Sequence, residues 1–308
     1  MIEVVHSQAP PALGGHLFVD PEFLSYQAGA QGKALEVFTA LGGRGEPMAS
    51  LTFAGKDGMW TSPITGAFGG VAAAPGCGTQ AAAAAVEAAS AWLHAQGLRA
   101  VLRLAPDGFA DRGSAAVENA LFRGGWRLAQ VDLNYHLDVP VGRDVLAGLG
   151  ETKQKEIRRL KRSGAAFVRL SLEDGERAYA VIAANRMARG YPMTMTWPQV
   201  RALAAAFPER AGFAIVERDG RAMAGAICLE LTAAWTYVFY WGESTESRRE
   251  SPIMLLAEGL VAERSVRGGV LDLGVSTDES APNPGLIGFK EGLGCRATSK
   301  RTYRFGPT

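Results

Sequence analysis

The sequence predicts an α/β protein of two similar halves with mixed sheets, because one series of elements occurs twice in the same order. Runs of β-prone residues between turn residues predict three antiparallel strands in each half. A helix, a strand that crosses over to pair in parallel, and a closing segment with a final strand follow. The corresponding segments are 34–41 with 212–220, 48–55 with 222–231, 58–70 with 234–244, 78–97 with 251–269, 99–106 with 270–276, and 121–139 with 288–305.

The limits of the two long helices are marked in the sequence. Ser251 is a suitable N-cap residue, and Pro252 fits the first helical position. Glycine follows both helices, as it does at many helix ends. A chain of 308 residues has the length of two domains. We therefore expect two duplicated domains, at 1–140 and 141–308.

Composition and charge are those of an ordinary soluble globular protein, with 47% hydrophobic residues, 20% charged residues and a formal net charge of +1. This balance gives no overall field that would select nucleic acid or an anionic membrane. The three cysteines are far apart and form no CxxC pair, so neither a disulfide framework nor a cysteine zinc site is expected. The four histidines lack metal-ligand spacing, so no metal is expected.

The sequence gives no indication of secretion or membrane insertion. Its first residues lack a basic region followed by an apolar core, so no signal peptide is expected. The most apolar window, 79–97, is rich in alanine and is interrupted by Glu87 and His94. It predicts a soluble helix rather than a membrane span. We therefore expect a cytoplasmic protein, whose oligomeric state the sequence does not determine.

One glycine pattern opens the first long helix. Gly76, Gly78 and Ala81 satisfy a loose dinucleotide-binding fingerprint. That fingerprint also needs a preceding strand and an acidic residue about 20 positions further on, and both are missing here. Free backbone N–H groups at a helix N-terminus can still hold an anion. A plain tight turn is the alternative.

A basic segment, 151–164, joins the two halves. Lys155, Arg158, Arg159 and Arg162 have helical spacing and form one stripe. Such a stripe is either the solvated face of a linker helix or a docking face for phosphate or nucleic acid.

Two acids and one lysine stand near the ends of predicted elements in the second half. Asp272 and Glu243 lie at strand ends, where α/β sheets often place functional groups. Hydrogen-bonded structural roles are the alternative. Lys290 lies between Phe289 and a glycine-rich turn, and its counterpart in the first half is Arg123. Lys290 is either a helix-end charge, which the helix dipole favours, or a cation directed at a ligand.

The second half resembles the Fem-type branch of the GNAT N-acyltransferases. The resemblance rests on short motifs in a fixed order, namely KQKEIRRLKRSG, FYWGES with Tyr240-Trp241, the strand end Asp272-Leu273-Gly274, and NPGLIGFKEGLG with Phe289-Lys290 and Gly294. In the first half, the run SPITGAFGG is similar to a Ser-Pro…aromatic-Gly-Gly run of the family.

The resemblance implies two tandem GNAT-like domains in a bacterial protein. It also implies transfer of an acyl or aminoacyl group, from an acyl thioester or an aminoacyl-tRNA, to an amine of a small molecule or peptide. The family lysine that corresponds to Lys290 is credited with stabilising the oxyanion, so Lys290 is the candidate catalytic residue. We expect its ammonium in the cleft between the two domains, near the strand ends that carry Tyr240 and Asp272, and Phe289 buried as its anchor. The candidate substrate-binding residues are Phe289, Tyr240, Trp241, Glu243, Asp272 and Asn283, with Arg158 and Arg159 at a phosphate of the donor, CoA or tRNA.

Two departures from the GNAT pattern concern the pyrophosphate loop. In the second half its place holds RRESPIMLL, which has no glycine. In the first half Gly76 and Gly78 are kept, but Ala73 stands where Arg or Gln belongs. Gly76 and Gly78 are therefore only weak candidates for binding acyl-CoA. The alternative function is a catalytically silent ligand-binding protein that keeps the tandem fold.

Overall fold

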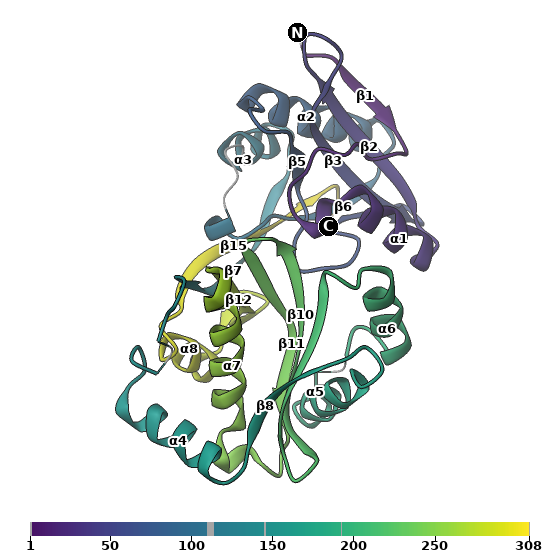
Figure 1. Ribbon diagram of the computed structural model, residues 1–308. Helices are drawn as coiled ribbons and strands as arrows, with labels where there is room; N and C mark the ends of the chain where they lie inside the picture. The colour runs from purple at the N-terminus through teal and green to yellow at the C-terminus, as the bar shows by residue number, and fades with distance from the viewer. Residues whose placement is uncertain (1, 110–113, 145, 192, 308) are drawn as a thin grey trace. The chain divides into compact units, whose positions relative to one another are not determined.

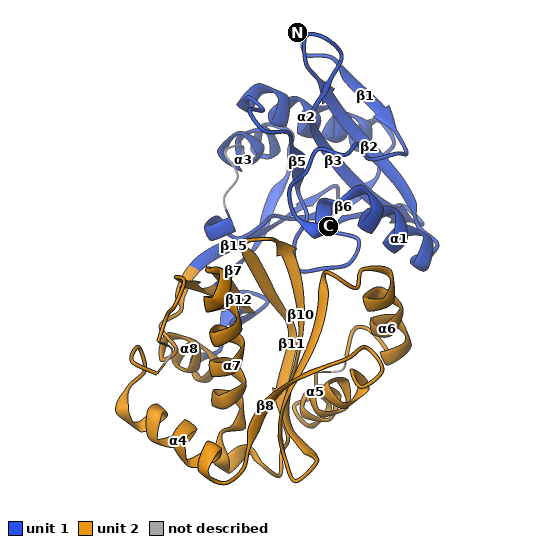
Figure 2. Ribbon diagram, in the orientation of Figure 1, with its two compact units in different colours: residues 1–134, 275–283, 298–308 blue, residues 135–274, 284–297 orange. Residues whose placement is uncertain are grey.

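The computed structural model describes residues 2–109, 114–144, 146–191 and 193–307, which form two compact units (Figures 1 and 2). Unit 1 comprises residues 1–134, 275–283 and 298–308, and unit 2 comprises residues 135–274 and 284–297. A cut at residue 140 separates the two sequence repeats, whereas the compact units interleave along the chain. Residues 135–139 of the first repeat belong to unit 2, while residues 275–283 and the end of the last strand of the second repeat belong to unit 1.

Unit 1 contains a mixed sheet with the strand order β1-β2-β3-β4-β6-β15, and β5 also pairs with β3. Its strands are β1 (Val4–Ser7), β2 (Ala34–Leu41), β3 (Pro47–Lys56), β4 (Met59–Ser62), β5 (Val71–Ala73), β6 (Arg99–Arg103) and the end of β15 (Arg296–Phe305). Its helices are η1 (Leu17–Val19), α1 (Pro21–Gln31), α2 (Thr79–Ala95), η2 (Asp107–Phe109) and α3 (Ser114–Arg123). Strand β4 runs parallel to β6, and the other pairs are antiparallel.

Alternation along the strands divides the core of unit 1 between two faces of its sheet. Val37 of β2 packs with Leu24 of α1. The next residue, Phe38, points to the other face and joins the larger cluster under α2 and α3, which includes Leu93 and Leu121. Successive side chains of a strand point to opposite faces, so one short strand contributes to both clusters.

Unit 2 contains a sheet with the order β7-β12-β11-β10-β9-β8. Its strands are β7 (Arg127–Val139, from residue 135), β8 (Ala166–Leu170), β9 (Ala211–Arg218), β10 (Arg221–Thr232), β11 (Trp235–Glu243) and β12 (Gly269–Val275). Its helices are α4 (Glu151–Arg162), α5 (Glu176–Ala188), α6 (Trp197–Ala206), α7 (Pro252–Arg267) and α8 (Pro284–Glu291). Figure 1 shows α5 and α6 on one face of this sheet and α4, α7 and α8 on the other.

The order of the elements confirms the predicted α/β fold with mixed sheets. The series β2, β3, β4–β5, α2, β6, α3, β7 of the first repeat matches β9, β10, β11, α7, β12, α8, β15 of the second. Loop 63–70 divides the third strand of the first repeat into β4 and β5, and both parts pair with β3. Helix α7 begins at Pro252 as predicted, but the Ser251 side chain makes no capping hydrogen bond.

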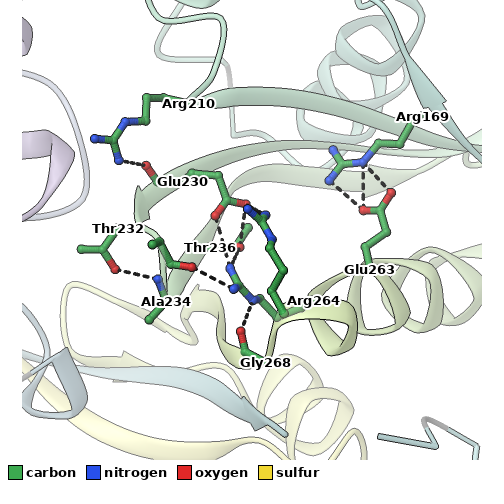
Figure 3. A network of polar contacts seen from close by, with 11 residues as sticks. Arg169, Arg210, Glu230, Thr232, Ala234, Thr236, Glu263, Arg264 and Gly268 are labelled. Carbon is green, nitrogen blue, oxygen red and sulfur yellow. Dashed lines mark hydrogen bonds and ion pairs between the residues drawn. The ribbon is translucent and has the colours of Figure 1, made fainter. Parts of the chain in front are cut away.

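The C-terminal end of α7 is fastened to the turn between β10 and β11 by one buried arginine (Figure 3). Arg264 donates through Nη1 to Thr236 Oγ1 at 3.1 Å and to Glu230 Oε2 at 3.3 Å. Its Nη2 donates to the Ala233 carbonyl at 2.9 Å, and its Nε donates to the Gly268 carbonyl at 2.7 Å. These bonds fix one end of α7, so the position of its N-terminal end, beside Glu243, is defined as well.

Candidate active site in unit 2

The site is built where two parallel strands stop pairing. Strands β11 and β12 pair at three positions, from Trp235 with Val270 to Tyr237 with Asp272. Among the described residues their ladder ends there, although β11 continues to Glu243. A register shift against β10 leaves Phe239 as an extra residue in β11, and such a bulge bends the strand.

Lys290 of α8 lies at the end of β12, just beyond the point where β11 and β12 stop pairing. Its side chain is 0% exposed, and its Nζ donates a hydrogen bond of 2.7 Å to the Gly274 carbonyl at the end of β12. The Nζ also lies 5.8 Å from the centre of the Tyr135 ring. Burial lowers the pKa of Lys290 to about 7, and the nearby Asp272 carboxylate opposes that shift. The amine is therefore divided between its charged and neutral forms near neutral pH.

Asp272 holds the same strand end from the other side. Its Oδ1 accepts the Gly274 N–H at 2.8 Å, and its Oδ2 accepts the Trp235 indole N–H at 3.3 Å. Gly274 has a φ of +73°, a conformation that glycine adopts without strain. Asp272 is fully buried. Asp272 and Lys290 thus bind the two backbone polar groups of one residue, Gly274.

The expected exposure of Phe289 and Lys290 is reversed. Lys290 was expected to reach into a cleft above a buried Phe289, but Lys290 is enclosed and Phe289 is only partly buried. The Phe289 ring instead packs against Trp241 of β11, with ring centres 5.6 Å apart. The physical reason is the hydrogen bond to the Gly274 carbonyl, which holds the long side chain of Lys290 inward.

Glu243 closes β11 beside the first turn of α7. The Ile253 N–H donates to its carboxylate. Its Oε1 lies 3.8 Å from Arg248 Nε, while its buried Oε2 has no hydrogen-bond partner among the described residues. Burial raises the pKa of Glu243, and the Ile253 hydrogen bond and nearby arginines offset part of that rise. Because Pro252 has no N–H, this carboxylate occupies the first free N–H of the helix.

Tyr240 belongs to the other face of β11. Its hydroxyl is hydrogen-bonded to the Thr194 hydroxyl, and the Arg186 guanidinium lies 5.6 Å from the centre of its ring. Tyr240 also packs in the cluster that contains Ile182 of α5. Trp241 points the opposite way, toward α8. The structure therefore brings Trp241, Phe289, Asp272 and Lys290 to one region of unit 2 but places Tyr240 beneath α5.

The remaining candidates lie elsewhere. Arg158 and Arg159 are exposed on α4, and Arg158 donates to Gln154 Oε1 at 2.9 Å. Asn283 belongs to unit 1, where it is exposed and its N–H donates to the Ser276 carbonyl at 2.9 Å. Gly76 and Gly78 are also in unit 1, in the exposed turn before α2.

Sequence reasoning missed residues of unit 2 that contact α8. Lys153 of α4 lies over Gly292, where an added Cβ would stand 1.6 Å from Lys153 Nζ. The Tyr135 hydroxyl donates to Glu291 Oε1 at 3.1 Å. Burial raises the pKa of the Cys295 thiol to about 12. Gly292, directly after the end of α8, was the one sequence signal of a close neighbour.

Within the described part of the chain, no group of three His, Cys, Asp or Glu side chains could hold a metal ion. None of the helices described there is both long and apolar enough to cross a membrane.

Sequence comparison and structural comparison give different results. No protein-family model matches the sequence, and a search of curated proteins finds no match. Solved structures match well. FemX has a TM-score of 0.68 at 12% identity, with 93% of this chain and 91% of FemX covered.

Two further structures agree with FemX. A tandem GNAT protein from the clavulanic acid biosynthesis pathway has a TM-score of 0.57 at 14% identity and covers 100% of both chains. L-PGS from Bacillus licheniformis has a TM-score of 0.57 at 12% identity, covering 95% of this chain and 93% of that one. The resemblance that the sequence motifs indicated is confirmed at the level of fold. The chain has a Fem/GNAT-like fold in the tandem arrangement.

Proposed function

We propose that the protein is an N-acyltransferase. It would transfer an acyl or aminoacyl group from an activated donor, an acyl thioester or an aminoacyl-tRNA, to an amine of a small molecule or peptide. The observation that carries the proposal is Glu243, a buried carboxylate at the end of β11 with one oxygen that has no partner among the described residues. The fold of the solved neighbours supports the same reaction class.

Glu243 has the properties of a general base for this reaction. An amine is protonated at neutral pH and must lose a proton before it can attack a carbonyl. A carboxylate accepts that proton more readily when burial raises its pKa, as burial does for Glu243. Its Oε2 is the atom that would take the proton, while the Ile253 N–H holds the carboxylate in place.

Lys290 has a positioning role in this proposal. Its Nζ is engaged by the Gly274 carbonyl and shielded from solvent, so contact with a substrate would require that bond to break. It fixes the end of β12, next to the region that β11 leaves unpaired. Trp241 and Phe289 form an aromatic pair there that an acceptor or acyl chain could contact.

The donor would not place a pyrophosphate on the N–H groups of the first turn of α7, where the GNAT pattern has its pyrophosphate loop. Glu243 occupies the Ile253 N–H, and Pro252 offers none, so a pyrophosphate would meet a carboxylate at this helix end. This arrangement disfavours acyl-CoA bound at α7. A phosphate-bearing donor at Arg158 and Arg159 of α4 stays part of the proposal, since both side chains are exposed.

The test compares Glu243→Gln with Glu246→Gln, a control whose carboxylate is exposed and pairs with Arg221. Both variants are assayed with a panel of aminoacyl-tRNAs, acyl thioesters and amines on which the wild type turns over. We expect Glu243→Gln to lower kcat by roughly 100-fold or more, as loss of a general base does, and Glu246→Gln to leave it unchanged. Equal turnover by both variants would remove Glu243 from the reaction.

A catalytically silent binding protein is the second candidate. The N-terminus of α7 favours it, because Glu243 occupies the Ile253 N–H and Pro252 has no N–H to offer a donor. Thermal-shift measurements with the same panel separate the two functions, because a bound ligand raises the midpoint whether or not it reacts. Ligands that stabilise the wild type without any turnover would support the silent protein.

A further inference from the structure

Unit 1 carries a polar face on two of its strands that the proposed function does not use. Strands β6 and β15 pair antiparallel, with Thr302 opposite Arg103 and Tyr303 opposite Leu102 (Figure 1). Tyr303 and Leu102 belong to the hydrophobic cluster under α2 and α3. By alternation Arg103, Thr302 and Arg304 therefore share the other face of the sheet.

The two arginines on this face have no charge partner of their own. Within the described ranges, neither the Arg103 nor the Arg304 side chain makes a hydrogen bond or an ion pair with another residue. They lie on diagonal positions of adjacent strands, a spacing that long side chains can bridge. The pKa of Arg103 is lowered first by burial and next by the charge of Arg304, so the two guanidinium groups repel each other.

One carboxylate of unit 1, that of Asp132, opposes this repulsion, and it already accepts two hydrogen bonds. Asp132 raises the pKa of Arg103 in part. Its Oδ1, however, accepts the Thr277 hydroxyl at 2.6 Å and the Ser280 N–H at 3.3 Å. The Asp132 carboxylate is therefore shared between these two donors and the charge of Arg103.

A buried hydroxyl lies beside the two arginines. Thr302 is 1% exposed, and its Oγ1 has no hydrogen-bond partner among the described residues. Buried hydroxyl groups in folded proteins are nearly always hydrogen-bonded, and an unpaired one destabilises the fold. Thr302 stands opposite Arg103 and two residues before Arg304, so a single group could contact all three side chains.

We propose that this face of unit 1 binds a phosphate group through Arg103, Arg304 and the Thr302 hydroxyl. Guanidinium groups bind phosphate oxygens in pairs of hydrogen bonds, and the hydroxyl supplies a further donor. Donors from two strands suit the tetrahedral arrangement of phosphate oxygens better than the planar carboxylate. Arg304 is exposed and Arg103 is half-buried, so a phosphate can reach both guanidinium groups from solvent, and a shift of these side chains would open the buried Thr302 hydroxyl to it. The proposal does not depend on acyl transfer in unit 2.

The proposed ligand is a phosphate group, and it could come from free inorganic phosphate or from a phosphate ester. Calorimetry with the full chain would use inorganic phosphate, adenosine monophosphate and glycerol 3-phosphate, with acetate at equal ionic strength as the planar competitor. We expect phosphate compounds to bind and acetate to bind at least about 10-fold more weakly, since it forms fewer charge-assisted hydrogen bonds. The ester that binds tightest identifies the source. Acetate binding as tight as phosphate, or no binding of any phosphate compound, would overturn the assignment.

Variants locate the bound phosphate. Arg103→Gln should weaken phosphate binding by about 10-fold or more, and Thr302→Val should weaken it less. Arg99→Gln is the matched control, because Arg99 is an exposed arginine on the same strand. Arg103→Gln should also leave the unliganded protein at least as stable as the wild type, because it removes repulsion between like charges. Undiminished phosphate binding by Arg103→Gln would refute the site.

Discussion

The Lys290 ammonium donates a hydrogen bond of 2.7 Å to the Gly274 carbonyl, and both residues are buried. The bond joins the last turn of α8 to the end of β12, beyond the point where β11 ceases to pair with β12. The Gly274 N–H is held by Asp272. One lysine and one aspartate therefore satisfy both backbone polar groups of a single residue, Gly274.

Lys290→Met should destabilise the protein. Methionine keeps much of the packing of the lysine stem but leaves the Gly274 carbonyl without its donor and Asp272 without a nearby cation. Loss of a hydrogen bond to a buried acceptor lowers the free energy of unfolding by about 1–3 kcal/mol. Urea denaturation at constant pH measures it. Arg123→Met is the control, since Arg123 holds the corresponding position in the first repeat but is exposed. A wild-type midpoint for Lys290→Met would show that the hydrogen bond to Gly274 contributes no stability.

The same lysine should make stability depend on pH above neutrality. Its pKa is about 7 in the folded protein against 10.5 in an unfolded chain. Between these values the unfolded state binds a proton that the folded state lacks, so the lysine contribution to stability falls as pH falls from about 10.5 to 7. Below about 7 both states bind the proton, and the contribution is constant.

Denaturation of the wild type and Lys290→Met at several pH values isolates this effect. The difference in unfolding free energy, wild type minus variant, should rise with pH from 7 to 10, by at most about 1.4 kcal/mol per unit. Parallel curves for the two proteins would show that Lys290 keeps an ordinary pKa.

Phe289→Ala should cost less than removal of a core phenylalanine. Phe289 is only partly buried and packs mainly against Trp241. We expect a loss of roughly 1–2 kcal/mol, below the 3–5 kcal/mol of a fully buried phenylalanine. Phe122, its counterpart in the first repeat, is 80% exposed, so Phe122→Ala should change little. Equal losses for the two variants would mean that the Trp241 contact contributes nothing.

The fold was predictable because the sequence signals that define its elements are local and occur in the same order in both halves. Strand periodicity, turn residues and helix ends define each element within a short window, and the repeat confirmed their order. The pairing of β15 with β6 was not predictable, because it joins segments nearly 200 residues apart. The division of one strand into β4 and β5 was also missed, although Pro63 and the three glycines of loop 63–70 are turn residues that could have marked it.

The site was less predictable because burial there is decided by tertiary contacts. The motif around Lys290 marked the right segment, but nothing local in the eight residues of α8 shows that the lysine faces inward. The Gly274 carbonyl that attracts it lies on another element. Tyr240 and Trp241 were expected in one cleft, although neighbours on a strand point to opposite faces. Alternation alone could have separated those two residues.

The last prediction compares two arginines of α7 near the same carboxylate. Arg264 is 4% exposed and donates to Glu230, Thr236, Ala233 and Gly268, whereas the Arg267 side chain is 66% exposed and lies 3.9 Å from Glu230. Arg264→Met should lower the free energy of unfolding by about 3–5 kcal/mol, because it leaves two backbone carbonyls and the partly exposed Glu230 without their donor. Arg267→Met should change it by less than about 1 kcal/mol, the range of exposed ion pairs.

The contrast follows from solvation rather than from charge. Water can replace Arg267, but it has little access to the two backbone carbonyls, of Ala233 and Gly268, that Arg264 satisfies. Urea denaturation of both variants at neutral pH measures the difference. Because Arg264 fastens the end of α7 opposite to Glu243, its loss should also reduce turnover in any assay that detects the wild type, while the Arg267 variant keeps it. Similar stability losses for the two variants would show that the Arg264 network does not hold α7 in place.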